Sequence, residues 1–417
     1  MRALIVHPGD GRAIRPRSAL AAARALAAAG WTVGIGSPGR DFVSASRASH
    51  RWHRVRSSWE SVEGFIEETR AAVIAGGYEV VFGSNDSDVL ALSSHRAAVG
   101  ASVPHPPHER VLRALDKLHL ASAARRVGLE TPRIPSDYSM GREVVVKPRV
   151  CQSTPQEAMV FSNLGQAASR IAEVAEAGGE PVVQERVRGQ LMAYVVVADR
   201  ESRVVARVQQ EARTIWPLNA GMSARAETVS VDEALAEKVA KLVQELGWFG
   251  LAQLQFVVPE NGVPVLIDFN GRLYGSIALA VAAGVNLPAI WGCVATDRSL
   301  PPTREALAGM RYQWEEGDFR RARAERRGGL ARDVGGSIHY FQEAAHSIWS
   351  ADDPVPALRV LQSLIAGSLR FRLGAARRQL SSTRSNQRSV DRPDGRPQPA
   401  PRMGPGRTEV PSQTGRR

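Results

Sequence analysis

One segment constrains the fold more than any other: two apolar runs that are separated by a short turn sequence. The runs are LAQLQFVV, residues 251–258, and VPVLIDFN, residues 263–270, and PENG stands between them. An Asn-Gly pair between two apolar runs is a strong indication of a tight β-hairpin. Because successive side chains of a strand point to opposite faces, residues two apart share a face. The segment therefore predicts an antiparallel hairpin whose polar residues are sorted by face.

The polar residues of this hairpin gather near one end. Asp268 and Asn270 share a face, and Arg272 follows directly. The turn brings Gln255 of the first strand beside them. One carboxylate and two amide oxygens are ligands that Mg²⁺ accepts, usually together with water and substrate phosphates, and a guanidinium pairs well with phosphate oxygens. The alternative is a polar strand end that faces solvent, and spacing alone leaves both open.

The first hundred residues alternate between strand and helix patterns. Residues 3–6 are a short apolar run, residues 18–30 have the composition of a helix that ends at a glycine, and residues 31–37 and 79–84 predict two more strands. This order is the opening of a parallel α/β unit. The cluster at 85–88, Asn-Asp-Ser-Asp, follows the last of these strands, where such sheets present a crevice. HPGDGR at residues 7–12 lacks the G-x-G-x-x-G spacing, so a nicotinamide dinucleotide site is disfavoured.

Changes in pattern and composition divide the chain. We predict an α/β and α+β protein with an α/β domain over residues 1–104, since PHPP at 104–107 marks a boundary. A mixed α+β domain with antiparallel strands is expected over residues 105–300, and a mainly helical extension over 301–371. Residues 372–417 are rich in Arg, Pro, Ser, Gly and Gln and poor in apolar types, so we expect a disordered basic tail.

The positive charge is concentrated in that tail. The chain carries a net charge of +12, and residues 372–417 hold eleven arginines and three acidic residues, a net +8. The other 371 residues therefore carry only +4. No aromatic residue interleaves the arginines of the tail, so the stacking partners of single-strand nucleic-acid binders are missing. Nucleic acid is accordingly a disfavoured partner.

Two further features bear on the compartment. The chain has only two cysteines, Cys151 and Cys293, so no disulfide framework is expected, as in a reducing cytoplasm. The most apolar longer segment, residues 276–295, is interrupted by Asn286, Pro288 and two glycines. A membrane span needs about 20 mostly apolar residues. We therefore expect a soluble cytoplasmic protein with no membrane partner.

The order of the motifs resembles the ATP-grasp superfamily. Asp116-Lys117 precedes a helix, VVVKPR spans 144–149, VVQERV spans 182–187, and VPVLIDFNGR closes the series at 263–272. The resemblance is greatest to carboxylate–amine ligase-like proteins and to the ATP-grasp modules of carbamoyl-phosphate synthetase, and it covers roughly residues 1–300. It implies a Rossmann-like pre-ATP-grasp domain at 1–104. It also implies an ATP-grasp domain of two α+β lobes at 105–300, with the flap-bearing lobe at about 140–187.

The resemblance implies roles for residues that would contact the nucleotide. Lys117 and Lys147 would reach the phosphates of ATP, and Arg272 would face the transferred phosphoryl group, which makes Lys147 and Arg272 the expected catalytic residues. Glu185 and the backbone at Val187 would face the adenine edge. Taken singly, each residue has another explanation, since Lys117 also suits a helix surface and Glu185 also suits a pair with a neighbouring arginine.

The resemblance likewise implies that Gln255, Asp268 and Asn270 bind Mg²⁺, or Mn²⁺, at the phosphates. Three departures from the family accompany it. Asp268 stands where many relatives have Glu, and the flap turn at 149–159, RVCQSTPQEAM, is not a Gly/Ser-rich loop whose N–H groups could approach phosphates. Residues 190–192, Gln-Leu-Met, stand where relatives often place a carboxylate for the ribose hydroxyls. Nucleotide binding or catalysis is therefore expected to be weakened.

Three functions follow from these observations. The first is an ATP-dependent ligase that activates a carboxylate as an acyl phosphate and joins it to an amine or similar nucleophile; a homodimer is left open. The second is a catalytically degenerate nucleotide-binding or regulatory protein, suggested by the altered flap turn. The third, nucleic-acid binding through the tail, is the least favoured. Arg207, Arg213 and Arg225 are candidates for holding the substrate carboxylate.

Overall fold

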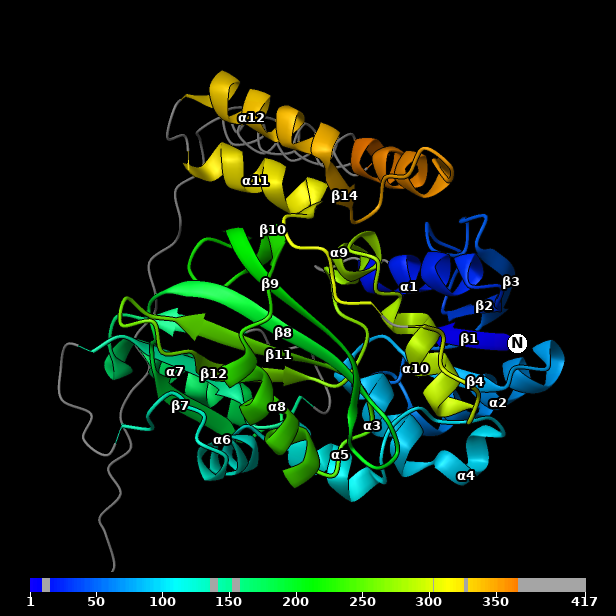
Figure 1. Ribbon diagram of the computed structural model, residues 1–417, viewed down its shortest axis with the longest axis horizontal. Coiled ribbons are helices and arrows are strands. Elements are labelled where there is room, and N and C mark those ends of the chain that lie inside the picture. The colour runs from blue at the N-terminus through cyan, green and yellow to red at the C-terminus, as the bar shows by residue number, and fades with distance from the viewer. Residues whose placement is uncertain (10–15, 136–141, 152–157, 303, 326–328, 367–417) are drawn as a thin grey trace, which may run out of the picture. The chain divides into compact units, whose positions relative to one another are not determined.

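The computed structural model describes residues 1–9, 16–135, 142–151, 158–302, 304–325 and 329–366 (Figure 1). The chain divides into two compact units, residues 1–360 and residues 361–417. Every element named below lies in the first unit. The tail that we expect to be disordered, 372–417, lies outside the described residues.

The N-terminal part is a four-stranded parallel sheet with the strand order β3-β2-β1-β4. Its strands are β1 (Arg2–Val6), β2 (Thr32–Ser37), β3 (Ser49–Arg54) and β4 (Val80–Gly83). Its helices are α1 (Arg17–Ala28), α2 (Val62–Gly76), α3 (Asp86–Ser94) and α4 (Arg96–Val99). The predicted α/β unit is therefore present. The sequence did not predict β3, because SHRWHR is a partly exposed edge strand without an apolar run.

A seven-stranded sheet follows, in the order β12-β11-β8-β9-β10-β13-β14. Its strands are β8 (Gln190–Ala198), β9 (Val204–Trp216), β10 (Met222–Val229), β11 (Gly250–Val258), β12 (Val265–Asn270), β13 (Arg311–Gln313) and β14 (Ala344–His346). Neighbouring strands are antiparallel except β13 and β14. The predicted hairpin is β11–β12, at one edge of this sheet.

Helices cover this sheet and extend beyond it. They are α5 (His108–Leu115), α6 (Lys117–Arg126), α8 (Glu233–Glu245), α9 (Ile277–Ala282), α10 (Leu287–Ala295), α11 (Glu315–Glu325) and α12 (Leu330–Glu343). Within the segment for which we predict a mainly helical extension, β13 and β14 join the large sheet. Among the described residues, no helix is long and apolar enough to cross a membrane. Both cysteines are free.

A small three-stranded sheet, in the order β6-β5-β7, forms a separate layer. Its strands are β5 (Val144–Pro148), β6 (Met159–Phe161) and β7 (Pro181–Glu185), and α7 (Leu164–Glu176) packs on it. Its buried cluster is small and consists of Val144, Val146 and Ala167. Val174 of α7 and Val182 of β7 are buried as well. The lobe predicted to carry the flap thus has a thin core of its own.

Two large cores hold the hairpin in place. One joins the N-terminal sheet to the seven-stranded sheet, because Ile5 of β1, Val195 of β8 and Trp291 of α10 belong to the same buried cluster. Figure 1 shows α9 and α10 next to the N-terminal sheet. The other core lies under α6 and α8 and includes Leu254 and Phe269 of the hairpin itself. The hairpin therefore stands on rigid packing, whereas the small sheet opposite it does not.

Candidate active site

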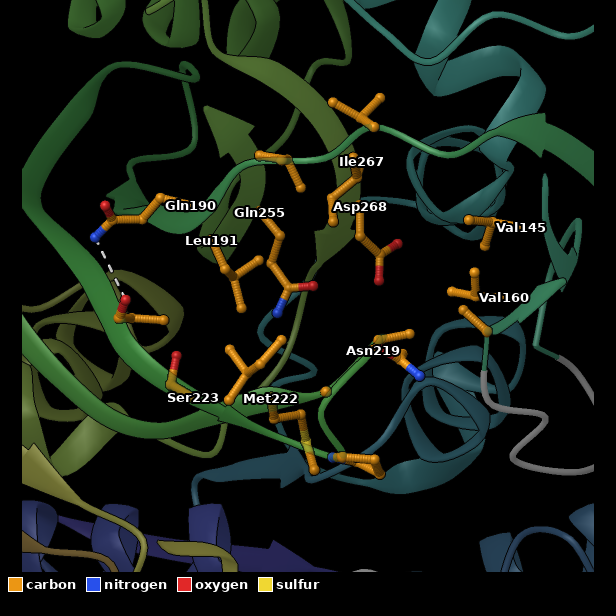
Figure 2. Close-up of a pocket in the computed structure, with 18 of the residues that line it drawn as sticks. Val145, Val160, Gln190, Leu191, Asn219, Met222, Ser223, Gln255, Ile267 and Asp268 are labelled. Atoms are coloured by element: carbon orange, nitrogen blue, oxygen red, sulfur yellow. Dashed lines mark hydrogen bonds between the residues drawn. The ribbon is translucent and has the colours of Figure 1, made fainter. Parts of the chain in front are cut away.

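The register of the hairpin places its polar side chains in pairs. Gln255 lies opposite Asp268, and Gln253 lies opposite Asn270. Figure 2 shows the Gln255 and Asp268 side chains next to each other and directed into a pocket. A Cβ at Gly271 would come within 2.3 Å of the buried Trp248 ring, so only glycine lets the backbone approach the ring this closely. The proximity of Gln255 to Asp268 and Asn270 that the sequence predicts is confirmed.

Two lysines reach this end of the hairpin from different elements. Lys117 begins α6 directly after the capping residue Asp116, and its Nζ donates to Asp268 Oδ1 at 2.5 Å. Lys147 lies near the end of β5, and its Nζ donates to the carbonyl of Ile267 at 2.7 Å. Both lysine side chains are buried. The Asp268 side chain is 29% exposed and lines the cavity, so it can also contact a ligand.

The environment shifts the pKa values of these groups in different directions. Burial opposes the charge on Lys117, but the Asp268 and Asp86 carboxylates outweigh it and raise its pKa. Burial lowers the pKa of Lys147 to about 8, since Asp268 offsets burial only in part. Burial also opposes the charge on Asp268, yet Lys117 and Lys147 lower its pKa overall. All three groups are therefore charged at neutral pH, with Lys147 the most easily discharged.

Arg272 connects the hairpin to the N-terminal sheet. Its Nε donates to Asp86 Oδ1 at 2.7 Å and its Nη2 donates to Asn270 Oδ1 at 2.9 Å. Asp86 opens α3 immediately after β4, in the cluster for which the sequence predicts a crevice. Lys117, Lys147 and Arg272 thus surround two carboxylates, Asp86 and Asp268. This excess of positive charge suits a polyanion.

These residues border a cavity of about 960 Å³. Its walls come from the hairpin, the small sheet and the β9–β10 connection. Figure 2 shows Val145 and Val160 of the small sheet across the pocket from Gln190 and Leu191 of β8. Ligand pockets commonly have volumes of roughly 300–1,000 Å³ with mostly apolar walls and a few convergent polar groups. The cavity is therefore large enough for a nucleotide.

The structure brings the predicted site residues together around this cavity. Those that line it are Lys147, Glu185, Val187, Gln255, Asp268, Asn270 and Arg272. Lys117 is not among the lining residues and contacts Asp268 instead. The Glu185 carboxylate accepts from Arg142 at 2.8 Å, so its pairing partner is not the adjacent arginine that the sequence suggested. The individual roles of these residues stay predictions.

Two of the departures from the family can be located. Gln190 and Leu191 line the cavity, and the Gln190 amide donates to Glu211 Oε2 at 3.2 Å. A carboxylate therefore stands next to the position where relatives often have one. The flap turn is described only at its ends, and residues 152–157 lie outside the described residues.

Of the three arginines considered for a substrate carboxylate, one lines the cavity. Arg213 does so, and it pairs with Glu211 and Glu227. Arg207 pairs with Glu233 of α8 and with Glu305, which precedes β13. Arg225 pairs with Asp318 of α11. Neither arginine lines the cavity, so both are better explained by these ion pairs than by a substrate.

Sequence reasoning missed Arg17 and Tyr274. Arg17 lines the cavity from α1, is 3% exposed, and stacks its guanidinium on the Trp314 ring at 3.8 Å from the ring centroid. Tyr274 lines the cavity two residues beyond Arg272. In the sequence, Arg17 is simply a polar residue at the start of an Ala-rich helix. Its role in the cavity wall could not be predicted, because its partner Tyr312 is 295 positions away.

The oxygen donors fit a magnesium ion in part. Asp268 Oδ2 and the Gln255 amide make no hydrogen bond to another described residue, so both can accept an ion. Asn270 Oδ1 already accepts from Arg272 and would have to release it first. Within the described ranges, no three His, Cys, Asp or Glu side chains gather as metal ligands. An ion here would take most of its ligands from phosphates and water, which is how Mg²⁺ usually binds.

Comparison with known proteins identifies the fold. Residues 182–317 match the family model described as "ATP-grasp in the biosynthetic pathway with Ter operon". Biotin carboxylase from Campylobacter jejuni is similar with a TM-score of 0.58 at 16% identity, over 74% of each chain. An L-amino acid ligase from Bacillus licheniformis has a TM-score of 0.53 at 14% identity, over 72% of this chain and 75% of the other. N5-carboxyaminoimidazole synthetase from Staphylococcus aureus has a TM-score of 0.55 at 13% identity, over 73% and 80%. No curated protein matches the sequence.

The chain therefore has the ATP-grasp fold, and the resemblance that rested on the hairpin is confirmed. Within that fold, it is similar to a carboxylase, an amino acid ligase and a synthetase. The family match contains the hairpin and Arg272, whereas Lys117 and Lys147 precede it.

Proposed function

We propose that this protein is an ATP-dependent ligase that activates a carboxylate as an acyl phosphate and joins it to an amine or similar nucleophile. One observation carries the proposal: three cations, Lys117, Lys147 and Arg272, outnumber the carboxylates among them beside a cavity of about 960 Å³. A polyphosphate supplies the negative charge that this group lacks. The ligase and synthetase named among the similar structures are consistent with it.

The reaction has two steps. A carboxylate oxygen of the substrate forms a bond to the γ-phosphorus of ATP, and the bond from that phosphorus to the β-bridging oxygen breaks, releasing ADP. The amine nitrogen then forms a bond to the carbonyl carbon of the acyl phosphate. Inorganic phosphate leaves with the bonding electrons, and the amine loses a proton to solvent. The protein has little covalent chemistry to do, so positioning and electrostatic stabilisation carry the catalysis.

The described residues divide this work. Lys117 and Lys147 hold phosphate oxygens, and Arg272 exchanges its bond to Asn270 for the transferred phosphoryl group. Gln255 and Asp268, and Asn270 once Arg272 has released it, would hold Mg²⁺, which would supply charge neutralisation at the phosphates. Glu185 and the backbone at Val187 face the adenine at the β7 end of the cavity. The small sheet, with its thin core, closes over the nucleotide and excludes water.

The test measures ADP release from Mg·ATP in the presence of a panel of L-amino acids and dicarboxylates. Asp268→Asn should lower substrate-dependent ADP release by about 100-fold or more, as expected for loss of a group that stabilises transition-state charge. Asp297→Asn is the matched control. Asp297 pairs with Arg200 on an exposed surface outside the cavity lining, and its positive φ of 52° is one that Asn tolerates.

Two results would contradict the proposal. One is wild-type turnover in Asp268→Asn. The other is the absence of Mg·ATP binding to the wild-type protein in calorimetric titration at millimolar concentration. Binding without turnover across the whole panel would instead favour the catalytically degenerate alternative.

A further inference from the structure

Arg17 is a buried cation in the cavity wall, and among the described residues it forms no ion pair with a carboxylate. Its side chain is 3% exposed, and its Nη1 reaches the Tyr312 hydroxyl at 3.4 Å, a long hydrogen bond. Among the described residues, no carboxylate lies within ion-pair distance of it, and the guanidinium also stacks on the Trp314 ring. Burial lowers the pKa of Arg17 and outweighs the Glu315 and Glu316 carboxylates, which lie farther away and favour its charge. Burying a charge without a partner is strongly unfavourable. The protein thus maintains an unfavourable arrangement at a position that faces a cavity.

Arg24, on the same helix, shows the opposite arrangement. Its Nε donates to Asp353 Oδ2 at 2.9 Å, and its other nitrogens donate to the carbonyls of Ile348 and Asp353. Arg24, which does not line the cavity, therefore forms an ion pair with a carboxylate. Arg17, which lines the cavity, forms no such pair with any residue that the structure describes.

Tyr274 repeats the pattern at the same wall. Its side chain is 1% exposed, and its hydroxyl has no hydrogen-bond partner among the described residues. Tyr312 connects the two residues, because its hydroxyl contacts Arg17 and donates to the Gly275 carbonyl at 2.8 Å. A Cβ at Gly275 would lie 3.1 Å from Arg17 Nη2, so glycine leaves the guanidinium its room. A guanidinium with one long hydrogen bond and a hydroxyl with no partner among the described residues therefore border one part of the cavity.

We propose that Arg17 binds a carboxylate of the substrate and that the Tyr274 hydroxyl donates to the same group. This assignment rests on the proposed ligase function and adds the residue that anchors its substrate. The guanidinium fork matches the two oxygens of a carboxylate. A phosphate group, by contrast, finds three cations at the hairpin end of the cavity and only one here. The substrate class is therefore a small carboxylate-bearing molecule such as an amino acid or a dicarboxylate.

The experiment compares Arg17→Lys and Tyr274→Phe with the matched controls Arg24→Lys and Tyr340→Phe. Tyr340 donates to the Ala226 carbonyl outside the cavity lining. With Mg·ATP and the same panel of L-amino acids and dicarboxylates, both test variants should raise KM for the carboxylate by about 10-fold or more, the value of one hydrogen bond to a charged group. KM for ATP should stay within twofold, and both controls should leave KM for the carboxylate unchanged.

Stability separates a ligand contact from a structural role. Tyr274→Phe removes a hydroxyl that bonds to nothing described, so it should melt at the same temperature as the wild type or higher. A lower melting temperature together with an unchanged KM would show that the hydroxyl serves the fold, which overturns its part in the proposal. Arg17→Lys keeps the positive charge but loses the planar, bidentate guanidinium. Because the charge is kept, this variant is less disruptive to folding than a neutral replacement.

Further outcomes separate this proposal from the proposed function. If the wild type turns over a panel member and both variants retain its KM, the carboxylate assignment is wrong and the ligase function stands. If Mg·ATP does not bind, the ligase function fails. The carboxylate site is then tested alone, by whether panel members raise the melting temperature of the wild type but not of Arg17→Lys. Absence of any such shift, or a larger shift with inorganic phosphate, overturns it.

Discussion

Two parts of the cavity wall, which we call the hairpin end and the Arg17 end, differ in how their charges are paired. At the hairpin end, Lys117 pairs with Asp268 and Arg272 pairs with Asp86. At the Arg17 end, beside Gly275, the guanidinium of Arg17 is buried with no carboxylate within ion-pair distance among the described residues. The ion pairs of the hairpin end are complete without a ligand, and one cation beyond those pairs is enough to attract a ligand. The Arg17 end is incomplete by itself, and a ligand would stabilise it.

Lys147 is the member of the hairpin end that most resembles the Arg17 end. Among the described residues its Nζ donates to a carbonyl and not to a carboxylate, and burial lowers its pKa to about 8. Lys147→Met should therefore weaken Mg·ATP binding by about 100-fold, or about 2.7 kcal/mol, the upper range for hydrogen bonds to charged groups. The melting temperature should change little, because removal of a buried charge offsets loss of the bond to the Ile267 carbonyl and of the attraction to Asp268. Calorimetric titration and thermal unfolding measure the two effects. Unchanged affinity would remove Lys147 from the phosphate site.

The hairpin end also depends on the buried His105. We therefore expect the free energy of unfolding to decrease at acid pH. His105 Nε2 donates to the Gly271 carbonyl at 3.0 Å, and the ring packs edge-on against Trp248 and Trp291. Burial lowers the pKa of His105 to about 3, and the bond to Gly271 offsets this only in part. Below pH 6.5 the unfolded chain binds a proton that the folded chain cannot, so stability is lost as pH falls.

The expected loss is about 2 kcal/mol at pH 5. The measurement is the free energy of unfolding of the wild type minus that of His105→Gln, in which the amide can still donate to Gly271. This difference should narrow by about 2 kcal/mol between pH 7 and pH 5, since the other titrating groups cancel. A difference that does not change with pH would show that the ring is not held neutral by burial.

Lys117 and Arg17 provide the direct contrast between the two ends. Lys117→Met leaves Asp268 without its partner, so the free energy of unfolding should fall by about 1–2 kcal/mol, less than for a fully buried pair because Asp268 is partly exposed. The double variant with Asp268→Asn should regain part of the lost free energy of unfolding, because the unpaired carboxylate is removed. Arg17→Met should leave stability unchanged or raise it. Chemical denaturation of the three variants measures this, and equal losses in Lys117→Met and Arg17→Met would abolish the distinction between the ends.

The hairpin end was predictable because its residues are close together in sequence. Alternation and the Asn-Gly turn place Gln255 opposite Asp268, and the structure has this register. The motif order also predicted the ATP-grasp fold, which the comparisons confirm. A local sequence pattern is sufficient to predict a site whose residues all come from one pair of adjacent strands.

The rest could not be predicted, for physical reasons. The bond from Asp86 to Arg272 spans 186 positions, and that from Arg17 to Tyr312 spans 295. Such contacts arise from the packing of the N-terminal sheet against α9 and α10, which no local pattern encodes. The sequence did not predict β3 for a different reason: it is a partly exposed edge strand, and such a strand needs no apolar run. The domain limits stay a prediction.

Thr214 offers the smallest and most local test of the comparison. Its hydroxyl lies at the cavity wall in β9 and has no partner among the described residues. Thr214→Val keeps the branched shape and should raise the free energy of unfolding by about 0.5–1 kcal/mol, because an unsatisfied buried hydroxyl is removed. Thr228→Val is the matched control: its hydroxyl donates to the Leu307 carbonyl at 2.6 Å and accepts from the Met310 amide at 3.0 Å, so this variant should lose about 1 kcal/mol or more. If Thr214→Val instead loses as much as the control, the hydroxyl is satisfied in solution, and an unpaired polar group in this cavity would cease to be evidence for a ligand.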